Sequence, residues 1–130
     1  MALRSYQELI AWQRSIQLVA DVYRAIQVFP REETYGLTSQ IRRAAVSIPS
    51  NIAEGQGRLS RGEFKQFLGH ARGSIFELES QLLIARSLDY FGDEETRILL
   101  GKVAEVARIL NGLLRSLGHG VSGWWLVASG

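Results

Sequence analysis

The stretch that decides the fold runs from Gln40 to Arg58 and reads QIRRAAVSIPSNIAEGQGR. With Leu37 just before it, its apolar residues recur at the three- and four-residue spacing of a helix that buries one face. These apolar residues are Leu37, Ile41, Ala45, Ile48 and Ile52. A polar stripe follows the same period beside them, and Pro49 lies in mid-run. Core packing requires neither feature, so the stretch indicates a specific partner.

The polar stripe and the proline predict a contact between subunits. Small residues such as Ala44 and Ala53 would allow another helix to approach closely. A proline inside a helix costs about 3 kcal/mol unless a kink absorbs it, and polar groups at a joint fix its register. The residues that we assign to an oligomer interface are Gln40, Ser47, Pro49, Asn51 and Glu54. The alternative is that Pro49 ends one helix and that Ser50 and Asn51 begin another.

Helical periodicity extends over the rest of the chain. A first helix should start near Ser5 and stop before Phe29, because Pro30 disfavours helix in the residue before it. The second should follow the acidic turn at residues 32–34 and end at Gly55 and Gly57. A capping box of Ser60 and Glu63 should begin a third, which runs to about residue 90, and a fourth should stop at Gly118. The expected core stripes of the first, third and fourth helices are Leu9, Trp12, Ile16, Val19, Tyr23 and Ile26; Phe64, Leu68, Ala71, Ile75, Leu78, Leu82 and Ala85; and Leu99, Val103, Val106, Leu110, Leu113 and Leu117.

These helices predict an all-α fold. The chain has 130 residues, which fits one domain, and no segment has the pattern of a strand. Long helices joined by short turns are typical of an up-down-up-down four-helix bundle. We expect the bundle at residues 1–117 and a C-terminal tail at residues 118–130.

Two of the helices are more hydrophobic than one buried face requires. The additional apolar residues are Phe67, Phe76, Leu83, Ile84 and Leu88 in the third helix, and Ile98, Leu100, Ala107, Ile109 and Leu114 in the fourth. A second apolar stripe is typical of self-association, so we expect a homo-oligomer. The alternative is one wide stripe at the centre of a compact bundle.

Positive charge is concentrated in one part of the chain. Residues 40–72 carry six basic side chains against Glu54 and Glu63, a net charge of +4, whereas the whole chain carries +2. Local basicity of this kind is typical of a surface that binds a polyanion. The candidate nucleic-acid-binding residues are Arg42, Arg43, Arg58, Arg61, Lys65 and Arg72. Arg58 and Arg61 also lie near the N-terminus of the third helix, where free amides favour an anion. The alternative is an ordinary solvated face.

Motifs for catalysis, metal and cofactors are missing. The chain has no cysteine, and neither His70 nor His119 follows a glutamate by three residues, which excludes the usual di-iron carboxylate bundle. The glycines at 55 and 57 lack the Lys-Ser/Thr ending of a phosphate loop. We therefore expect a protein that is not an enzyme and holds no metal or cofactor. No apolar run approaches the roughly 20 residues of a membrane span, so we expect a cytoplasmic protein that does not contact membranes.

The central stretch is also a family signature. The residues that carry the likeness are Tyr35-Gly36-Leu37, residues 40–55, Gly57-Arg58, Glu63-Phe64, Phe29-Pro30, Glu33, Ala71-Arg72-Gly73-Ser74 and residues 77–82. Over roughly residues 5–117 the chain resembles the four-helix-bundle proteins encoded in intervening sequences of bacterial 23S ribosomal RNA genes. The resemblance implies a left-handed up-down bundle and, as in related members, a homopentameric ring. It also implies kinship with the accessory variability determinant of diversity-generating retroelements, which pairs with a reverse transcriptase and nucleic acid through basic surfaces.

Two functions follow as hypotheses. The first is an accessory protein whose ring binds RNA or DNA phosphates through the six basic residues. The second is a structural adaptor, in which the same arginines pair with carboxylates and the ring holds a protein partner such as a reverse transcriptase. The tail lies beyond the family match and contains Trp124 and Trp125. These tryptophans are expected to cover their own bundle, to dock on a neighbouring subunit, or to stack on a base.

Overall fold

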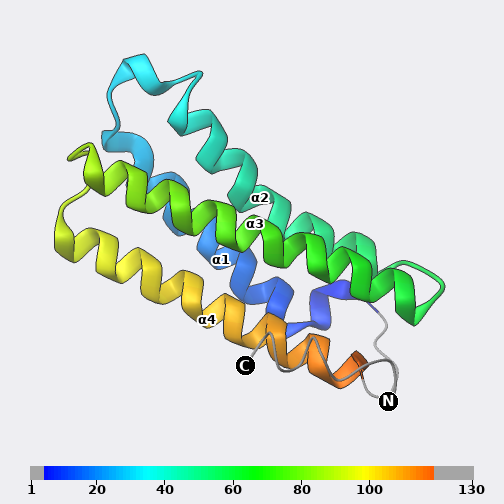
Figure 1. The fold of residues 1–130 in the computed structure, drawn as a ribbon. Helices are drawn as coiled ribbons and strands as arrows, with labels where there is room; N and C mark the ends of the chain where they lie inside the picture. Colours follow the sequence, from blue (N-terminus) through cyan, green and yellow to red (C-terminus); the bar gives the residue numbers. More distant parts are fainter. Residues whose placement is uncertain (1–4, 119–130) are drawn as a thin grey trace.

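The chain folds into four long helices that alternate in direction. The computed structural model describes residues 5–118, and this part contains no strand. The helices are α1 (Ile10–Ala25), α2 (Leu37–Gln56), α3 (Arg61–Ser87) and α4 (Asp93–Gly118), and the 3-10 turns are η1 (Tyr6–Glu8), η2 (Ile26–Val28) and η3 (Arg31–Glu33). Figure 1 shows each helix running back along the previous one. The predicted all-α four-helix bundle is confirmed.

The first helix begins later than the sequence predicted. Ser5 caps the short turn η1, where its side chain accepts a hydrogen bond from the amide of Gln7 at 3.1 Å. Leu9 then adopts an extended conformation with ψ of 126°, so α1 begins only at Ile10. At the other end η2 stops at Val28 and Phe29 is extended, as Pro30 predicts.

The face that α1 buries differs from the predicted stripe. Its buried residues are Ala11, Ser15, Leu18 and Val22. In contrast, Ile16 is 42% exposed and Tyr23 is 37% exposed, so both predictions were wrong. Because Ala11 and Ser15 are small, the α1 backbone packs close to its neighbours, and the hydroxyl of Ser15 is satisfied by the carbonyl of Trp12 at 2.8 Å. The larger side chains consequently lie on the flank of the helix.

The core stripes of the other helices were predicted more accurately. All five expected residues of α2 are buried, and in α3 the expected residues from Leu68 to Ala85 are buried while Phe64 is partly exposed. In α4 the stripe is buried as far as Leu110. Beyond that point Leu114 replaces Leu113 as the buried residue, and Leu117 is only partly buried.

Helix α2 is continuous through its proline. Pro49 is buried inside Leu37–Gln56, so the alternative of two separate helices is wrong. Proline has no amide hydrogen, and it therefore cannot donate the helical bond to the carbonyl of Ala45. Packing of the apolar face, which includes Ile48 and Ile52 at full burial, maintains the helix across this position.

Gly55 permits the closest approach between α2 and α3. A Cβ atom at this position would lie 2.7 Å from Cβ of Phe67 and 3.0 Å from Cδ1 of Phe64. The prediction that Gly55 ends the helix was wrong, because α2 continues to Gln56 and Gly57 is the C-cap. The C-cap has φ of −78°, which any residue can adopt. The requirement for glycine at position 55 therefore comes from packing.

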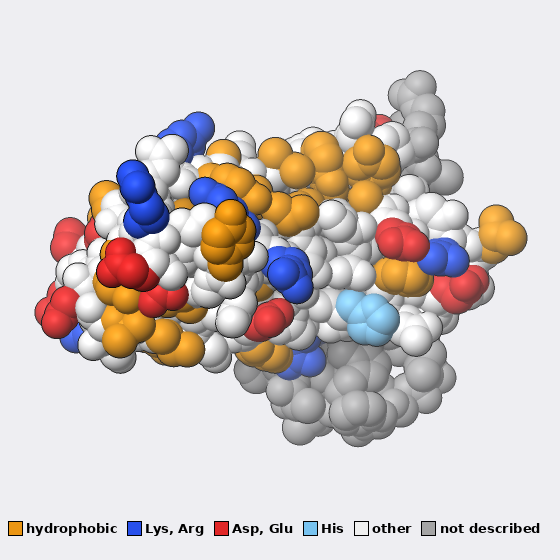
Figure 2. All heavy atoms as spheres, turned by 90° about the horizontal axis from the view of Figure 1, so that it is seen from above, with side chains coloured by type: hydrophobic (Ala, Val, Ile, Leu, Met, Phe, Trp, Pro, Cys, Tyr) orange, Lys and Arg blue, Asp and Glu red, His pale blue; other side chains and the backbone are white. Residues whose placement is uncertain are grey.

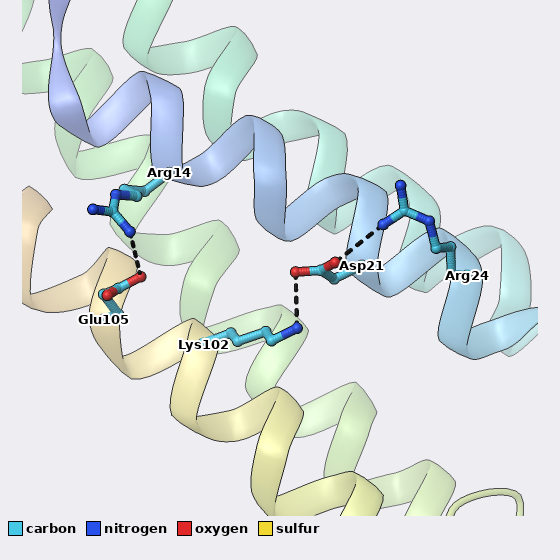
Figure 3. A network of polar contacts seen from close by, with 5 residues as sticks. All are labelled: Arg14, Asp21, Arg24, Lys102 and Glu105. Atoms are coloured by element: carbon cyan, nitrogen blue, oxygen red, sulfur yellow. Dashed lines mark hydrogen bonds and ion pairs between the residues drawn. The ribbon is translucent and has the colours of Figure 1, made fainter.

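Ion pairs connect α1 to α4 along the outside of the bundle. The carboxylate of Asp21 lies 3.0 Å from Nζ of Lys102 and 3.1 Å from Arg24, and Arg14 lies 3.6 Å from Glu105 (Figure 3). The two pairs between helices show that α1 and α4 run antiparallel. All of these groups are partly exposed, and such pairs contribute at most about 1 kcal/mol each.

A carboxylate fixes the loop between α1 and α2. One oxygen of Glu33 accepts the amide of Leu37 at 3.0 Å, and the other accepts the hydroxyl of Tyr90 at 2.7 Å. These bonds, the amide first, lower the pKa of Glu33 below its usual value, and the same contact raises the pKa of Tyr90. The acidic turn therefore caps α2 as the sequence indicates. Within residues 5–118 no helix has the length and apolar character needed to span a membrane.

Candidate nucleic-acid interface

Polar side chains align the α2–α3 hairpin. The hydroxyls of Ser47 and Ser74 lie 2.8 Å apart, and the amide of Asn51 donates to the carbonyl and to the hydroxyl of Ser47 at 2.8 and 2.9 Å. Ser47 and Asn51 therefore bond within the chain. Of the other predicted interface residues, Gln40 and Glu54 are exposed and Pro49 is buried. Their role in a subunit contact stays a prediction.

Three of the predicted basic residues lie near the middle of this hairpin. Arg42 and Arg43 are exposed on α2, and Arg72 is partly buried on α3, two residues before Ser74. The guanidinium of Arg42 lies 5.3 Å from the ring centre of Tyr23, and that of Arg72 lies 5.3 Å from the ring centre of Phe76. Nε of Arg72 is buried and has no hydrogen-bond partner among residues 5–118. We call Arg42, Arg43 and Arg72 the central cations.

The other three lie where the hairpin turns. Arg58 forms an ion pair with Glu54 at 2.7 Å and lies 4.6 Å from the ring centre of Phe67. Arg61 is exposed and Lys65 is partly buried in the first turns of α3. We call Arg58, Arg61 and Lys65 the hairpin-end cations. They begin sixteen residues after Arg42, which is about 24 Å along a helix. Arg72 is seven residues from Lys65 on the same helix, about 10 Å, so the six residues are spread along the hairpin instead of forming one compact patch.

The anion position predicted at the start of α3 is partly occupied by protein groups. The hydroxyl oxygen of Ser60 accepts the amide of Glu63 at 3.1 Å, which confirms the helix cap. The same hydroxyl donates to the carboxylate of Glu63 at 3.2 Å, so this carboxylate does not return to the cap amide as a full capping box requires. The carboxylate of Glu63 therefore already places a negative charge at the N-terminus of α3.

Ion pairing leaves most of the candidate cations unpaired. Of the six ion pairs within residues 5–118, only Arg58–Glu54 includes one of them. The others lie elsewhere, as in Arg97–Glu94, where the arginine holds the pKa of the glutamate below its usual value. Figure 2 shows basic side chains spread along the face of the bundle seen from above, interrupted by acidic and apolar ones. This spacing suits an extended anion better than a compact one.

Aromatic partners of the arginines are the part of the site that sequence reasoning missed. Arg72 and Phe76 are four residues apart on one helix, a spacing that places two side chains together, so this contact had a sequence signal. Tyr23 on α1 meets Arg42 on α2, and Phe67 on α3 meets Arg58 in the turn that follows α2, and no local pattern predicts those contacts. A guanidinium stacked on a ring keeps its edges free to donate hydrogen bonds.

A shallow depression accompanies the central cations. It has a volume of about 220 Å³ and is lined by Gln40, Arg43, Ala44, Ser47 and Glu77. Glu77 gives this depression mixed charge. Within residues 5–118 no group of three histidine, aspartate or glutamate side chains could hold a metal ion, and His70 is exposed beside Phe67.

Comparisons with known proteins agree with the architecture. The sequence model of the family described as 23S rRNA-intervening sequence protein matches residues 7–112. A solved structure of a protein of unknown function from the S23 ribosomal protein family of Bacteroides thetaiotaomicron superposes with a TM-score of 0.72 at 20% identity, covering 81% of this chain and 98% of that chain. At this identity the likeness establishes the fold alone. The search of curated proteins found no match. Because the family match covers most of the chain, the protein belongs to the 23S rRNA-intervening sequence protein family.

Proposed function

We propose that this protein is a non-enzymatic, cytoplasmic accessory factor that binds RNA through the α2–α3 face and acts as a homo-oligomer. The observation that carries the proposal is the set of cations without carboxylate partners on this one hairpin. Within residues 5–118, Arg42, Arg43, Arg61, Lys65 and Arg72 form no ion pair, although acidic residues elsewhere in the bundle are paired.

The arrangement of these cations suits a nucleic-acid backbone. Arg42 and Arg58 are sixteen residues apart, about 24 Å along a helix, so an extended strand could contact cations along the hairpin while a single phosphate could not. Arginine donates several hydrogen bonds in a fixed plane, which matches phosphate oxygens. Contacts of this kind determine affinity and position without reading sequence.

Assembly into a homo-oligomer would strengthen such binding. One subunit offers only a few phosphate contacts, whereas a ring repeats the same face and raises the effective concentration of each site. Large apolar side chains remain exposed on α3 and α4: Phe76 at 51%, Leu83 at 45%, Ile84 at 47%, Leu88 at 50% and Ile98 at 45%. Surfaces of this kind are typical of protein contacts, and they support self-association. The pentamer is the state that the family resemblance implies.

Salt-dependent RNA binding tests this function. Fluorescence anisotropy with a labelled single-stranded RNA should show affinity that falls steeply between low and moderate salt. Arg42→Gln and Arg61→Gln should each weaken binding and reduce the slope of log affinity against log salt by about 0.7, the value for one contact on a single strand. Arg108→Gln is the matched control, because Arg108 is exposed on α4 and forms no ion pair with residues 5–118.

Two results would count against RNA binding. One is the absence of binding at low salt in the wild-type chain. The other is an equal loss in the Arg108→Gln control, which would reflect net charge alone.

The adaptor hypothesis has an observation of its own. Arg58 already binds the carboxylate of Glu54, and Arg43 shares a depression with Glu77, so this face also accommodates carboxylates. Under this hypothesis the oligomer would form, RNA would not bind, and Arg61→Gln would weaken the capture of an acidic protein instead.

A further inference from the structure

An apolar groove lies between α1 and α2 on the side of the bundle away from α4. It has a volume of about 300 Å³. Its lining residues are Tyr6, Trp12, Ile16, Val19, Val46, Pro49, Ser50 and Ala53. Ile16 is 42% exposed and Val46 is 40% exposed, so large apolar side chains face solvent along it. The groove includes Ile16, which the sequence pattern wrongly placed in the core of α1.

Among residues 5–118, no charged side chain lines the groove, which restricts what it would bind. The described side chains of its walls are aliphatic and aromatic, and their polar groups are the hydroxyls of Tyr6 and Ser50 and the indole N–H of Trp12. Burial of such walls is favourable only against an apolar partner, because a charged group would lose its hydration there. The neighbouring depression shares Val46 with this groove but differs in that Arg42 and Arg43 also line it.

One segment of this chain has matching chemistry. Residues 119–130 read HGVSGWWLVASG and contain no aspartate, glutamate, lysine or arginine. They lie outside the described residues. Trp124, Trp125 and Leu126 stand together in the middle of this segment. Tryptophan buries more apolar area than most residues, and two of them in water are unfavourable unless they are covered.

The end of α4 is close enough for these residues to reach the groove. Arg14 pairs with Glu105, so Gly118 lies about 20 Å along α4 from the level of Arg14 and about 17 Å from the level of Trp12. Figure 1 shows the end of α4 at the same end of the bundle as the start of α1. Crossing one helix adds about 10 Å. In an extended chain, the six residues from Gly118 to Trp124 span about 20 Å, which is enough to reach Trp12. The eight residues from Gly118 to Leu126 span about 27 Å, which is enough to reach Ile16.

We propose that Trp124, Trp125 and Leu126 dock in the α1–α2 groove of their own chain. The tail then covers Trp12, Ile16 and Val46 with apolar surface and completes this side of the bundle. This proposal is independent of RNA binding and of the oligomeric state.

Disulfide cross-linking tests the docking directly, because the natural chain has no cysteine. The test variant carries Ile16→Cys and Leu126→Cys, and the control carries Gln17→Cys and Leu126→Cys. Ile16 lines the groove, whereas Gln17 is exposed at the same level of α1 and does not line it. A disulfide needs Cβ atoms roughly 3.5–4.5 Å apart, so only a docked tail favours one partner over its neighbour.

The expected result is an in-chain disulfide that forms at least about tenfold faster in the Ile16→Cys variant than in the control, because docking raises the local concentration of the thiol beyond that of a free tether. Intact mass and non-reducing gels at low protein concentration measure it. Equal rates in the two variants would overturn the proposal. A covalent dimer would overturn it as well, because the tail would then occupy a second copy.

A charge in the groove provides a second test. Val46→Glu should release the tail, shift tryptophan emission to longer wavelength and increase acrylamide quenching. Val46 is partly exposed, so the bundle should still fold. The control is Val28→Glu, because Val28 is 65% exposed and does not line the groove. Emission that stays the same in Val46→Glu would contradict docking.

Discussion

Replacing Gly55 by alanine should destabilise the protein, even though alanine is the better helix former. The added Cβ would lie 2.7 Å from Cβ of Phe67 and 3.3 Å from the carbonyl oxygen of Phe64, whereas carbon atoms in contact stay about 3.5–4.0 Å apart. Neither neighbouring atom belongs to a flexible side-chain end. The clash with the added Cβ can therefore be relieved only if α2 and α3 separate by nearly 1 Å at their closest contact.

The size of the destabilisation depends on two opposed contributions, the cost of overpacking and the gain in helix propensity. Overpacking of a tight contact costs about 1–3 kcal/mol. Alanine recovers at most about 1 kcal/mol of helix propensity, and less here because Gly55 is in the last turn of α2. The expected net loss in the free energy of unfolding is about 1–2 kcal/mol. Urea unfolding followed by circular dichroism should show a lower midpoint with an unchanged slope.

Gly69→Ala is the matched control. Gly69 is exposed in the interior of α3, and a Cβ built there meets nothing within 4 Å. The same substitution should therefore stabilise the protein by about 0.5–1 kcal/mol through helix propensity alone. Opposite signs at the two sites are the expected result. If Gly55→Ala is neutral, or stabilises as much as Gly69→Ala does, the close approach of α2 and α3 is refuted.

Three further substitutions test the fold. Ile48→Ala should lower the free energy of unfolding by about 2–5 kcal/mol in urea titrations, because Ile48 is fully buried, and a loss under 1 kcal/mol would contradict that burial. Ser60→Ala should cost about 1 kcal/mol by removing the cap of α3, whereas Ser80→Ala, at an exposed site inside α3, should cost little. Glu33→Gln should lower the thermal midpoint at pH 7, because the lowered pKa of Glu33 means that its ionised form stabilises the fold. This stability is present above about pH 4.3 and is lost as pH falls through the lower folded pKa, so the two proteins should converge in acid, and a constant difference would contradict the assignment.

The sequence supplied the candidate site residues, whose role stays a prediction, but it did not supply their layout. The sequence showed that positive charge is concentrated in residues 40–72, because charge can be counted along a chain. It did not show that Arg58 pairs with Glu54 at 2.7 Å, nor that Arg42 stacks on Tyr23. The spacing of four residues made the first contact accessible to inspection. The second depends on how α1 lies against α2, which no local pattern contains.

The sequence by itself determined the helices, their approximate limits and the buried face of α2, because helical periodicity and caps are local properties of the chain. Only the tertiary structure decided which face of α1 is buried. The pattern favoured Ile16 and Tyr23 for their size, but the helix packs through Ala11 and Ser15. A packed interior requires complementary shapes from both helices, and small residues allow their backbones to come close. The same requirement determines the role of Gly55, because the atoms that exclude a side chain there belong to another helix.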